Sequence, residues 1–311
     1  MPYALAVLRE DDAVVPVVEV GDVFYRISDI APDLSVDPAR GLMDLFADWD
    51  ATQSALEKGI ALLDRSGAKA ITPPAGTDFA PPLTYPGKIV CTGVNYYDHL
   101  RLDAGIPDFD KSRFDILYFL KHSRALVGSG GSVRFPSQSK QLDWEVELVV
   151  VFGKQGRRIA VENAMDYIAG YAIGIDLSAR DWQFNDRHVK QFDLFTGKSF
   201  DDSAPMGPKI VPAKFVDPAA LELKLWVNGD IKQDSTTDEM IWSIPEQIAE
   251  LSRHMTIEPG DILFTGSPAG VGHATHSFLG RGDKVTARIT GLGSLEFEII
   301  ADPDEALAAV S

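Results

Sequence analysis

Apolar and polar positions divide the first part of the chain into short strands followed by helices. Residues 3–30 alternate β-branched runs with glycine and acidic breaks, which is typical of strands joined by tight turns and predicts a small hairpin-rich module. Residues 38–49 and 52–66 carry apolar residues at helical spacing, and this periodicity predicts two helical stretches. The segment therefore predicts a small N-terminal α/β unit.

A proline-rich segment separates this unit from the rest of the chain. Residues 71–88 contain five prolines in eighteen positions. Proline fixes φ and lacks a backbone N–H, so the segment is not expected to be regular. We place a domain boundary there and predict a small N-terminal domain at residues 1–75 and a larger domain at residues 85–303.

The larger part reads as short strands broken by glycine, with a few helices and without the βαβ repeat of doubly wound folds. Asn228 and Gly229 form a hairpin signal, and Ser243 with Glu246 forms a capping box before a helix that runs to about His254. This pattern predicts that the fold belongs to the α+β class. The main expected strands are residues 89–94, 145–152, 171–177 and 221–227, and a short helix is expected at residues 96–104.

One predicted strand gathers acidic side chains. Within the sequence LDWEVELVVVFGK, residues Asp143, Glu145 and Glu147 share one face of an extended chain. Neighbouring carboxylates repel each other unless something neutralises them. Asp176 ends a second apolar strand, where a lone carboxylate is costly to bury. A hard divalent cation such as Mg²⁺ prefers such oxygen ligands, but spacing alone leaves open an exposed strand face with an unrelated helix cap at Asp176.

Several other residues are candidates for the site, and each of them also has a simpler structural explanation. His99 and Asp103 are four residues apart, so they can pair on one helical face, which would orient the imidazole as a base, or they are surface neighbours. Lys198 lies in a loop, and Arg180 and Gln183 follow Asp176 by about one turn, where ordinary surface charge is the alternative. The loop at residues 265–272 offers hydroxyl and N–H groups for a carboxylate, or is only a turn.

Composition excludes several functional classes. The 311-residue chain has a formal charge of −17, which disfavours nucleic acid or an anionic membrane as a partner. Cys91 is the only cysteine, so no intrachain disulfide is possible, and we expect a cytoplasmic protein. Dinucleotide-binding, P-loop and G-x-S-x-G motifs do not occur in the sequence. His273 and His276 alone make a weak case for zinc.

The order of several motifs resembles the fumarylacetoacetate hydrolase family. These motifs are GVNYYDH, DWEVELVVVFGK, GIDLSARDWQ, GKSFDDSAPMGP, VNGD and GDILFTGSPAGVG, and together they span roughly residues 85 to 300. The resemblance implies a mixed β-roll catalytic domain with flanking helices, usually a homodimer, that uses Mg²⁺ or Mn²⁺ and acts on small 2-oxo or 2,4-dioxo acids.

The resemblance also assigns expected roles to individual residues. It implies that Glu145, Glu147 and Asp176 are metal ligands and that Lys198 contacts the substrate. His99 would be a lid histidine that activates water. Residues that line the substrate pocket would be Arg180, Gln183 and Thr265. Asp143 is expected behind the ligands as a supporting group.

Two positions depart from the family pattern. Family hydrolases commonly carry a glutamate one helical turn after the lid histidine, whereas Leu102 occupies that position here and the acid is Asp103, with one extra residue before Gly105. His122, in place of a frequent proline, follows Lys121.

The predicted reaction is hydrolysis of a carbon–carbon bond in an acylpyruvate-like acid, with His99 and Asp103 activating water. Decarboxylation of oxaloacetate-type acids and hydration or isomerisation of 2-hydroxydienoic acids remain open, because they use the same metal and enolate chemistry. A non-catalytic protein that binds 2-oxo acids is a third interpretation.

Overall fold

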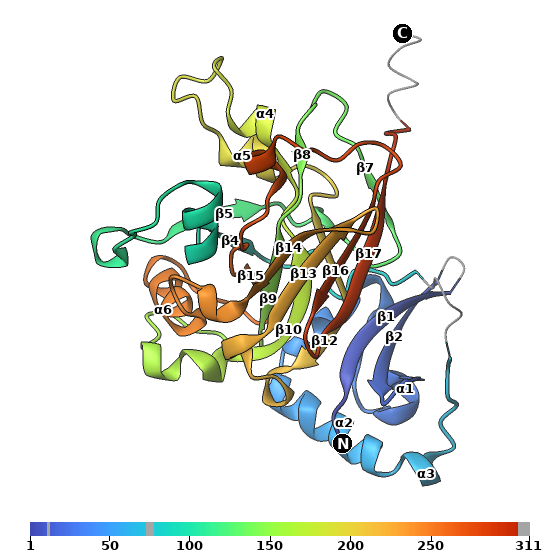
Figure 1. Cartoon of the computed structure of the whole chain (residues 1–311). Coiled ribbons are helices and arrows are strands. Elements are labelled where there is room, and N and C mark those ends of the chain that lie inside the picture. Colours follow the sequence, from blue (N-terminus) through green and yellow to red (C-terminus); the bar gives the residue numbers. More distant parts are fainter. Residues whose placement is uncertain (11–12, 73–77, 304–311) are drawn as a thin grey trace.

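The structure is a computed structural model that describes residues 1–10, 13–72 and 78–303. Two mixed sheets and flanking helices form the described chain (Figure 1). The α+β class predicted from the sequence is confirmed. Within the described residues, no helix combines the length and apolar character needed to cross a membrane.

The larger sheet has ten strands in the order β3-β2-β1-β12-β10-β9-β15-β4-β5, with β6 paired to β12. Its central strand β9 is antiparallel to both of its neighbours, β10 and β15, while β15 and β4 are parallel. In chain order its strands are β1 Ala4–Glu10, β2 Ala13–Val20, β3 Val23–Arg26, β4 Ile89–Gly93, β5 Leu117–Lys121, β6 Leu126–Val127, β9 Val146–Phe152, β10 Ile168–Ile175, β12 Ala204–Pro212 and β15 Ile262–Phe264.

A second sheet has the order β14-β13-β16-β17-β7 and packs against the first, and β8 and β11 form a separate pair. These strands are β7 Ser132–Arg134, β8 Leu142–Asp143, β11 Ser178–Ala179, β13 Glu222–Val227, β14 Asp230–Thr236, β16 Lys284–Ile289 and β17 Gly293–Ile300. Asn228 and Gly229 both have positive φ in the turn from β13 to β14, as the predicted Asn-Gly hairpin requires.

Helices in the described chain are mostly short. The α-helices are α1 Ile27–Ile30, α2 Trp49–Ala61, α3 Leu63–Ser66, α4 Arg180–Gln183, α5 Leu194–Lys198, α6 Ile244–His254 and α7 Gly272–Thr275. The remaining helical turns are η1 Pro38–Arg40, η2 Met43–Phe46, η3 His99–Asp103, η4 Lys111–Arg113, η5 Val161–Tyr167, η6 Ala213–Phe215, η7 Pro218–Ala220 and η8 Thr237–Glu239. Before α6, the backbone N–H of Ser243 donates to Glu246 at 2.8 Å, so the predicted helix start is confirmed.

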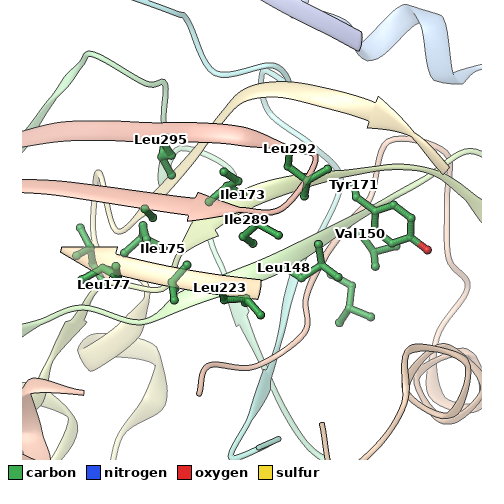
Figure 2. Close-up of a cluster of buried hydrophobic side chains, with 14 of the residues drawn as sticks. Leu148, Val150, Tyr171, Ile173, Ile175, Leu177, Leu223, Ile289, Leu292 and Leu295 are labelled. Carbon is green, nitrogen blue, oxygen red and sulfur yellow. The ribbon is translucent and has the colours of Figure 1, made fainter. Parts of the chain in front are cut away.

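Strand β9 is apolar throughout because both of its faces are covered. Leu148 and Val150 pack toward the second sheet, where β13, β16 and β17 supply the opposing side chains (Figure 2). Val149 and Val151 belong to the core on the other face, together with residues of α2 such as Leu56. A strand buried on both faces reads as a continuous hydrophobic run rather than an alternating one.

The N-terminal strands continue the larger sheet. Strand β1 pairs antiparallel with β12, with Leu5 opposite Ile210, and β1 to β3 lie at one end of the molecule beside α2 (Figure 1). The predicted helical stretch at residues 38–49 consists of two short turns, η1 and η2, before α2 begins. The division into domains at residues 1–75 and 85–303 stays a prediction, and residues 73–77 of the proline-rich segment lie outside the described chain.

Candidate active site

Three carboxylates meet where β9 lies beside β10. Glu147 is opposite Gly174 in this pairing, and the backbone N–H of Asp176 donates to the carbonyl of Glu145 at 2.8 Å. Glu145, Glu147 and Asp176 are all buried, and each offers an oxygen within 4.8 Å of the oxygens of the others. The structure therefore brings together the three residues expected as metal ligands.

Lys198, at the end of α5, bridges two of these carboxylates. Its Nζ lies 2.6 Å from Oε2 of Glu145 and 2.7 Å from Oδ2 of Asp176. Burial alone would lower the pKa of Lys198, but the carboxylates of Asp176 and Glu145 outweigh it and raise that pKa above its usual value. The lysine is therefore a fixed cation in the site.

A second lysine, Lys121, which had no role predicted from the sequence, contacts the other carboxylate oxygen of Asp176. The fully buried Nζ of Lys121 lies 2.7 Å from Oδ1 of Asp176. It also donates to the carbonyl oxygens of Leu177, Lys198 and Ser203. An ammonium has only three N–H groups, so these carbonyls use them and Oδ1 of Asp176 is left without a hydrogen bond. In the sequence, Lys121 is a charged residue at the end of the largely apolar run of residues 116–120.

Arg180, at the start of α4, connects the triad to a supporting carboxylate. Its guanidinium lies 2.5 Å from Oε1 of Glu145 and 2.8 Å from Oδ2 of Asp143. The backbone N–H groups of Gly272 and His273 donate to Asp143 at 2.6 and 2.9 Å. Asp143 thus lies behind the triad and orients it through Arg180, the arrangement expected of a supporting group.

The carboxylates of the triad differ in their electrostatic environment. Burial would raise the pKa of Glu145, but the cations Lys198 and Arg180 outweigh it and hold that pKa well below its usual range. The pKa of Glu147 is raised well above its usual value, first by burial and then by the charges of Asp176 and Glu145. Glu147 is therefore the ligand whose ionisation most needs an added positive charge.

The donor set fits a hard divalent cation. Carboxylate oxygens are the ligands that Mg²⁺ and Mn²⁺ prefer. The unsatisfied buried Oδ1 of Asp176 and the unfavourable charge of Glu147 are both features that such an ion would compensate. Glu145, Glu147 and Asp176 would hold the ion.

His99 and Asp103 form a close pair on the helical turn that follows β4. Nδ1 of His99 lies 2.7 Å from Oδ2 of Asp103. The turn is a π-helix, in which the N–H of Ala104 donates to the carbonyl of His99 at 3.2 Å. The same carboxylate accepts from the N–H of Gly270 at 3.0 Å, while Leu102 is 68% exposed. The turn thus accommodates the extra residue and still places an acid against the histidine.

A pocket of about 190 Å³ is bordered by His99, Glu145 and Lys198, whereas Glu147, Asp176 and Asp103 are not among the residues that line it. Its three phenylalanines, Phe119, Phe184 and Phe192, had no role predicted from the sequence. It is lined by Thr92, Gly93, Val94, His99, Leu117, Phe119, Glu145, Arg180, Gln183, Phe184, Phe192, Leu194, Lys198, Ser267, Val271 and His273.

Of the residues expected to bind substrate, Arg180 and Gln183 line the pocket and Thr265 does not. Gln183 lines the pocket, and its Oε1 accepts a hydrogen bond from Arg180 at 3.1 Å. Thr265 is fully buried, its hydroxyl donates to the carbonyl of Leu148 at 2.8 Å, and it is not among the lining residues. A direct role for Thr265 stays a prediction.

The fold and the site thus combine a cluster of three buried carboxylates, a donor set that suits a divalent cation, with a neighbouring small-molecule pocket. The sequence profile of the fumarylacetoacetate (FAA) hydrolase C-terminal family matches residues 88–300. The chain belongs to this family, as the resemblance of its motifs indicated.

Curated relatives include proteins with and without a named activity. The chain is 42% identical over 217 residues to an uncharacterised protein of Pyrococcus horikoshii, covering 70% of this chain and 90% of that protein. It is 38% identical to the mitochondrial oxaloacetate tautomerase FAHD2A of Homo sapiens, covering 74% of this chain and 72% of that protein.

Solved structures of hydrolases share the fold. A fumarylpyruvate hydrolase from Pseudomonas aeruginosa, in complex with Mn²⁺ and pyruvate, is 34% identical with a TM-score of 0.62, covering 75% of this chain and 94% of that chain. A fumarylacetoacetate hydrolase from Exiguobacterium antarcticum is 28% identical with a TM-score of 0.79, covering 96% and 100% of the two chains. The expected fold of the fumarylacetoacetate hydrolase type is thereby confirmed.

Proposed function

We propose that this protein is a divalent-metal-dependent hydrolase that cleaves a carbon–carbon bond in acylpyruvate-like 2,4-dioxo acids and releases pyruvate and a carboxylic acid. The observation that carries the proposal is the pair formed by His99 and Asp103, 2.7 Å apart, whose histidine lines the same pocket as Glu145 and Lys198. This hydrolysis requires a base that activates water and carboxylates that hold a cation, both beside one pocket.

The triad and Lys198 would bind the 2-oxo acid end of the substrate. A Mg²⁺ or Mn²⁺ ion held by Glu145, Glu147 and Asp176 would supply Lewis-acid chemistry at that end. Lys198 uses two contacts on carboxylates, which leaves one N–H of its ammonium for the substrate. The amide nitrogen of Gln183 is a second candidate donor, because its oxygen is already bound to Arg180.

His99 would act on water at the other carbonyl. Its Nδ1 contacts Asp103, so Nε2 is the nitrogen that would take a proton from the attacking water. The water oxygen bonds to the distal carbonyl carbon, and the bond from that carbon to C3 of the pyruvyl part then breaks. The electron pair goes to the pyruvate fragment as its enolate, which takes a proton at C3. The distal carbon leaves as a carboxylic acid.

A second candidate is keto–enol tautomerisation of an oxaloacetate-type acid, and the named activity of the 38% identical human relative favours it. In that reaction the base removes a proton from C3, the electron pair forms the C2–C3 double bond, the oxygen on C2 takes up a proton, and no carbon–carbon bond breaks. The residues of the site would keep their places, and only the target of His99 would change.

Isotope labelling separates the two reactions. Purified protein with Mn²⁺ and an acylpyruvate in H₂¹⁸O should release a carboxylic acid that carries one atom of ¹⁸O, as mass spectrometry would show. A tautomerase in ²H₂O would exchange deuterium into C3 of oxaloacetate and leave acylpyruvates intact. Intact acylpyruvate after prolonged incubation, with C3 exchange in oxaloacetate, would exclude the hydrolase in favour of the tautomerase.

We also propose that the protein is a homodimer, as members of this family commonly are. Size-exclusion chromatography with light scattering should give twice the 33.9 kDa mass of the chain. A mass equal to one chain at micromolar concentration would contradict this proposal.

A further inference from the structure

The wall of the pocket away from the triad is apolar and aromatic. The ring of Phe184 stacks on His273 with centroids 5.3 Å apart and lies 5.4 Å from the ring of Phe192. Leu117 and Leu194 also line the pocket. These side chains come from β5, from the segment after α4, and from α5 and α7. We call the group Phe184, Phe192, Leu194, Leu117 and His273 the aromatic wall.

Parts of this wall are exposed even though they border a concave site. Phe184 is 47% exposed, Phe192 41% and Leu117 41%. Removing apolar surface from water is favourable in proportion to its area. An apolar group of a bound molecule would gain this stabilisation, whereas a charged group would lose hydration there without a partner.

The cations around the pocket are already matched to carboxylates. Arg180 pairs with Asp143 and Glu145, and Lys198 pairs with Glu145 and Asp176. Among the described residues that line the pocket, these are the only permanently charged cations. Burial, followed by the charge of Arg180, lowers the pKa of His273, so the wall itself stays neutral.

With a divalent ion bound, the charges of the site would neutralise one carboxylate of a substrate but not two. Counted with all four carboxyl groups ionised, as they would be around a bound cation, its acidic side chains face three cations and leave one negative charge; the acids are Asp143, Glu145, Glu147 and Asp176, and the cations are Lys121, Arg180 and Lys198. A divalent ion would turn this into one positive charge, which the carboxylate of a single 2-oxo acid group neutralises. His99 and Asp103 add no positive charge, because a protonated imidazole only cancels its own aspartate.

We propose that the pocket selects 2-oxo acids whose remote substituent is an uncharged alkyl or aryl group and discriminates against those that carry a second carboxylate. The inference rests on the proposed 2-oxo acid function of the triad. Phe184 and Phe192 would be the specificity-determining residues, because they contribute most of the exposed aromatic surface of the wall.

Binding of two six-carbon acids tests this preference without any turnover. 2-Oxohexanoate and 2-oxoadipate have the same 2-oxo acid end and differ only in a terminal methyl or carboxylate group. Isothermal titration calorimetry on the full chain with Mn²⁺ should give a dissociation constant about tenfold lower for 2-oxohexanoate. A value for 2-oxoadipate that is equal or lower would overturn the inference.

A charge placed on the wall should reverse the preference. Phe192→Arg should weaken binding of 2-oxohexanoate and strengthen binding of 2-oxoadipate, because it supplies the missing cation. Phe195→Arg is the matched control: Phe195 is 65% exposed on the same stretch of chain and does not line the pocket. Equal changes in the ratio of dissociation constants for both variants would show that overall charge, and not the wall, sets the ratio.

The outcomes distinguish this inference from the proposed hydrolase function. A preference for 2-oxohexanoate in a protein that leaves acylpyruvates intact would support the inference and exclude the hydrolase. Cleavage of acylpyruvates together with tighter binding of 2-oxoadipate would exclude the inference alone. Failure of both acids to bind would overturn the inference together with the 2-oxo acid site on which it rests.

Discussion

Nζ of Lys121 lies 2.7 Å from Oδ1 of Asp176, although the three N–H groups of this lysine are directed at backbone carbonyls. The contact is therefore an ion pair without a hydrogen bond. This geometry keeps a negative oxygen close to a positive charge while leaving its lone pairs available. A ligand oxygen held in this way is oriented before any cation binds.

Replacement of Lys121 should destabilise the protein more than replacement of an exposed lysine, because its side chain is fully buried. Lys121→Met leaves a buried carboxylate and three carbonyls without their partner, and breaking a buried pair typically costs about 3–5 kcal/mol. Urea unfolding of the metal-free protein measures the change. Lys154→Met is the control, because Lys154 and Asp50 form an exposed pair that is worth roughly 0–1 kcal/mol. Similar losses for both variants would contradict a structural role for Lys121.

Neutralising Glu147 should separate metal binding from folding. In Glu147→Gln, the amide resembles the protonated carboxyl that burial and the neighbouring acids favour, so the metal-free protein should be as stable as the wild type or more stable. Affinity for Mn²⁺, measured by calorimetry, should fall by about tenfold or more, because one anionic ligand is lost. The exposed Glu298→Gln should change neither quantity. Unfolding of Glu147→Gln with unchanged metal affinity would identify the carboxylate as structural.

Removal of the cation should abolish turnover. Dialysis against EDTA should eliminate activity toward an acylpyruvate, and addition of Mg²⁺ or Mn²⁺ should restore it, because the 2-oxo group needs a Lewis acid. The far-ultraviolet circular dichroism spectrum should remain unchanged, because hydrophobic packing and not the ion holds the two sheets together. Full activity in excess EDTA would exclude the proposed metal chemistry.

The sequence predicted those parts of the site that local patterns encode. The alternation around Glu145 and Glu147 and the lone acid at Asp176 are visible within a few residues, and the structure brings these three together. The spacing of His99 and Asp103 likewise indicated a pair, which the structure shows at 2.7 Å. Short-range spacing is informative in these cases because each strand or turn fixes the direction of its side chains.

Other features depend on contacts between distant segments. Lys121 reaches carbonyls 56, 77 and 82 residues away in the sequence, and no local pattern encodes such partners. The pairing of β1 with β12 and the stacking of Phe184 on His273 are long-range in the same way. The alternation of residues 142–147 also predicted a single strand, whereas Trp144 and Glu145 lie between β8 and β9.

His99 and Asp103 provide the sharpest test of the proposed reaction. Attack of water on a ketone needs a base, and a positioned base typically contributes about 10²- to 10⁴-fold, whereas loss of CO₂ from a 2-oxo acid needs only a sink for electrons. His99→Ala should therefore reduce kcat for acylpyruvate hydrolysis by roughly that factor and affect oxaloacetate decarboxylation much less. Asp103→Asn should cause part of the hydrolytic loss, because it removes the charge beside Nδ1. Leu102→Ala, at an exposed position of the same turn, is the control. Equal and small effects of His99→Ala on both reactions would exclude water activation by His99.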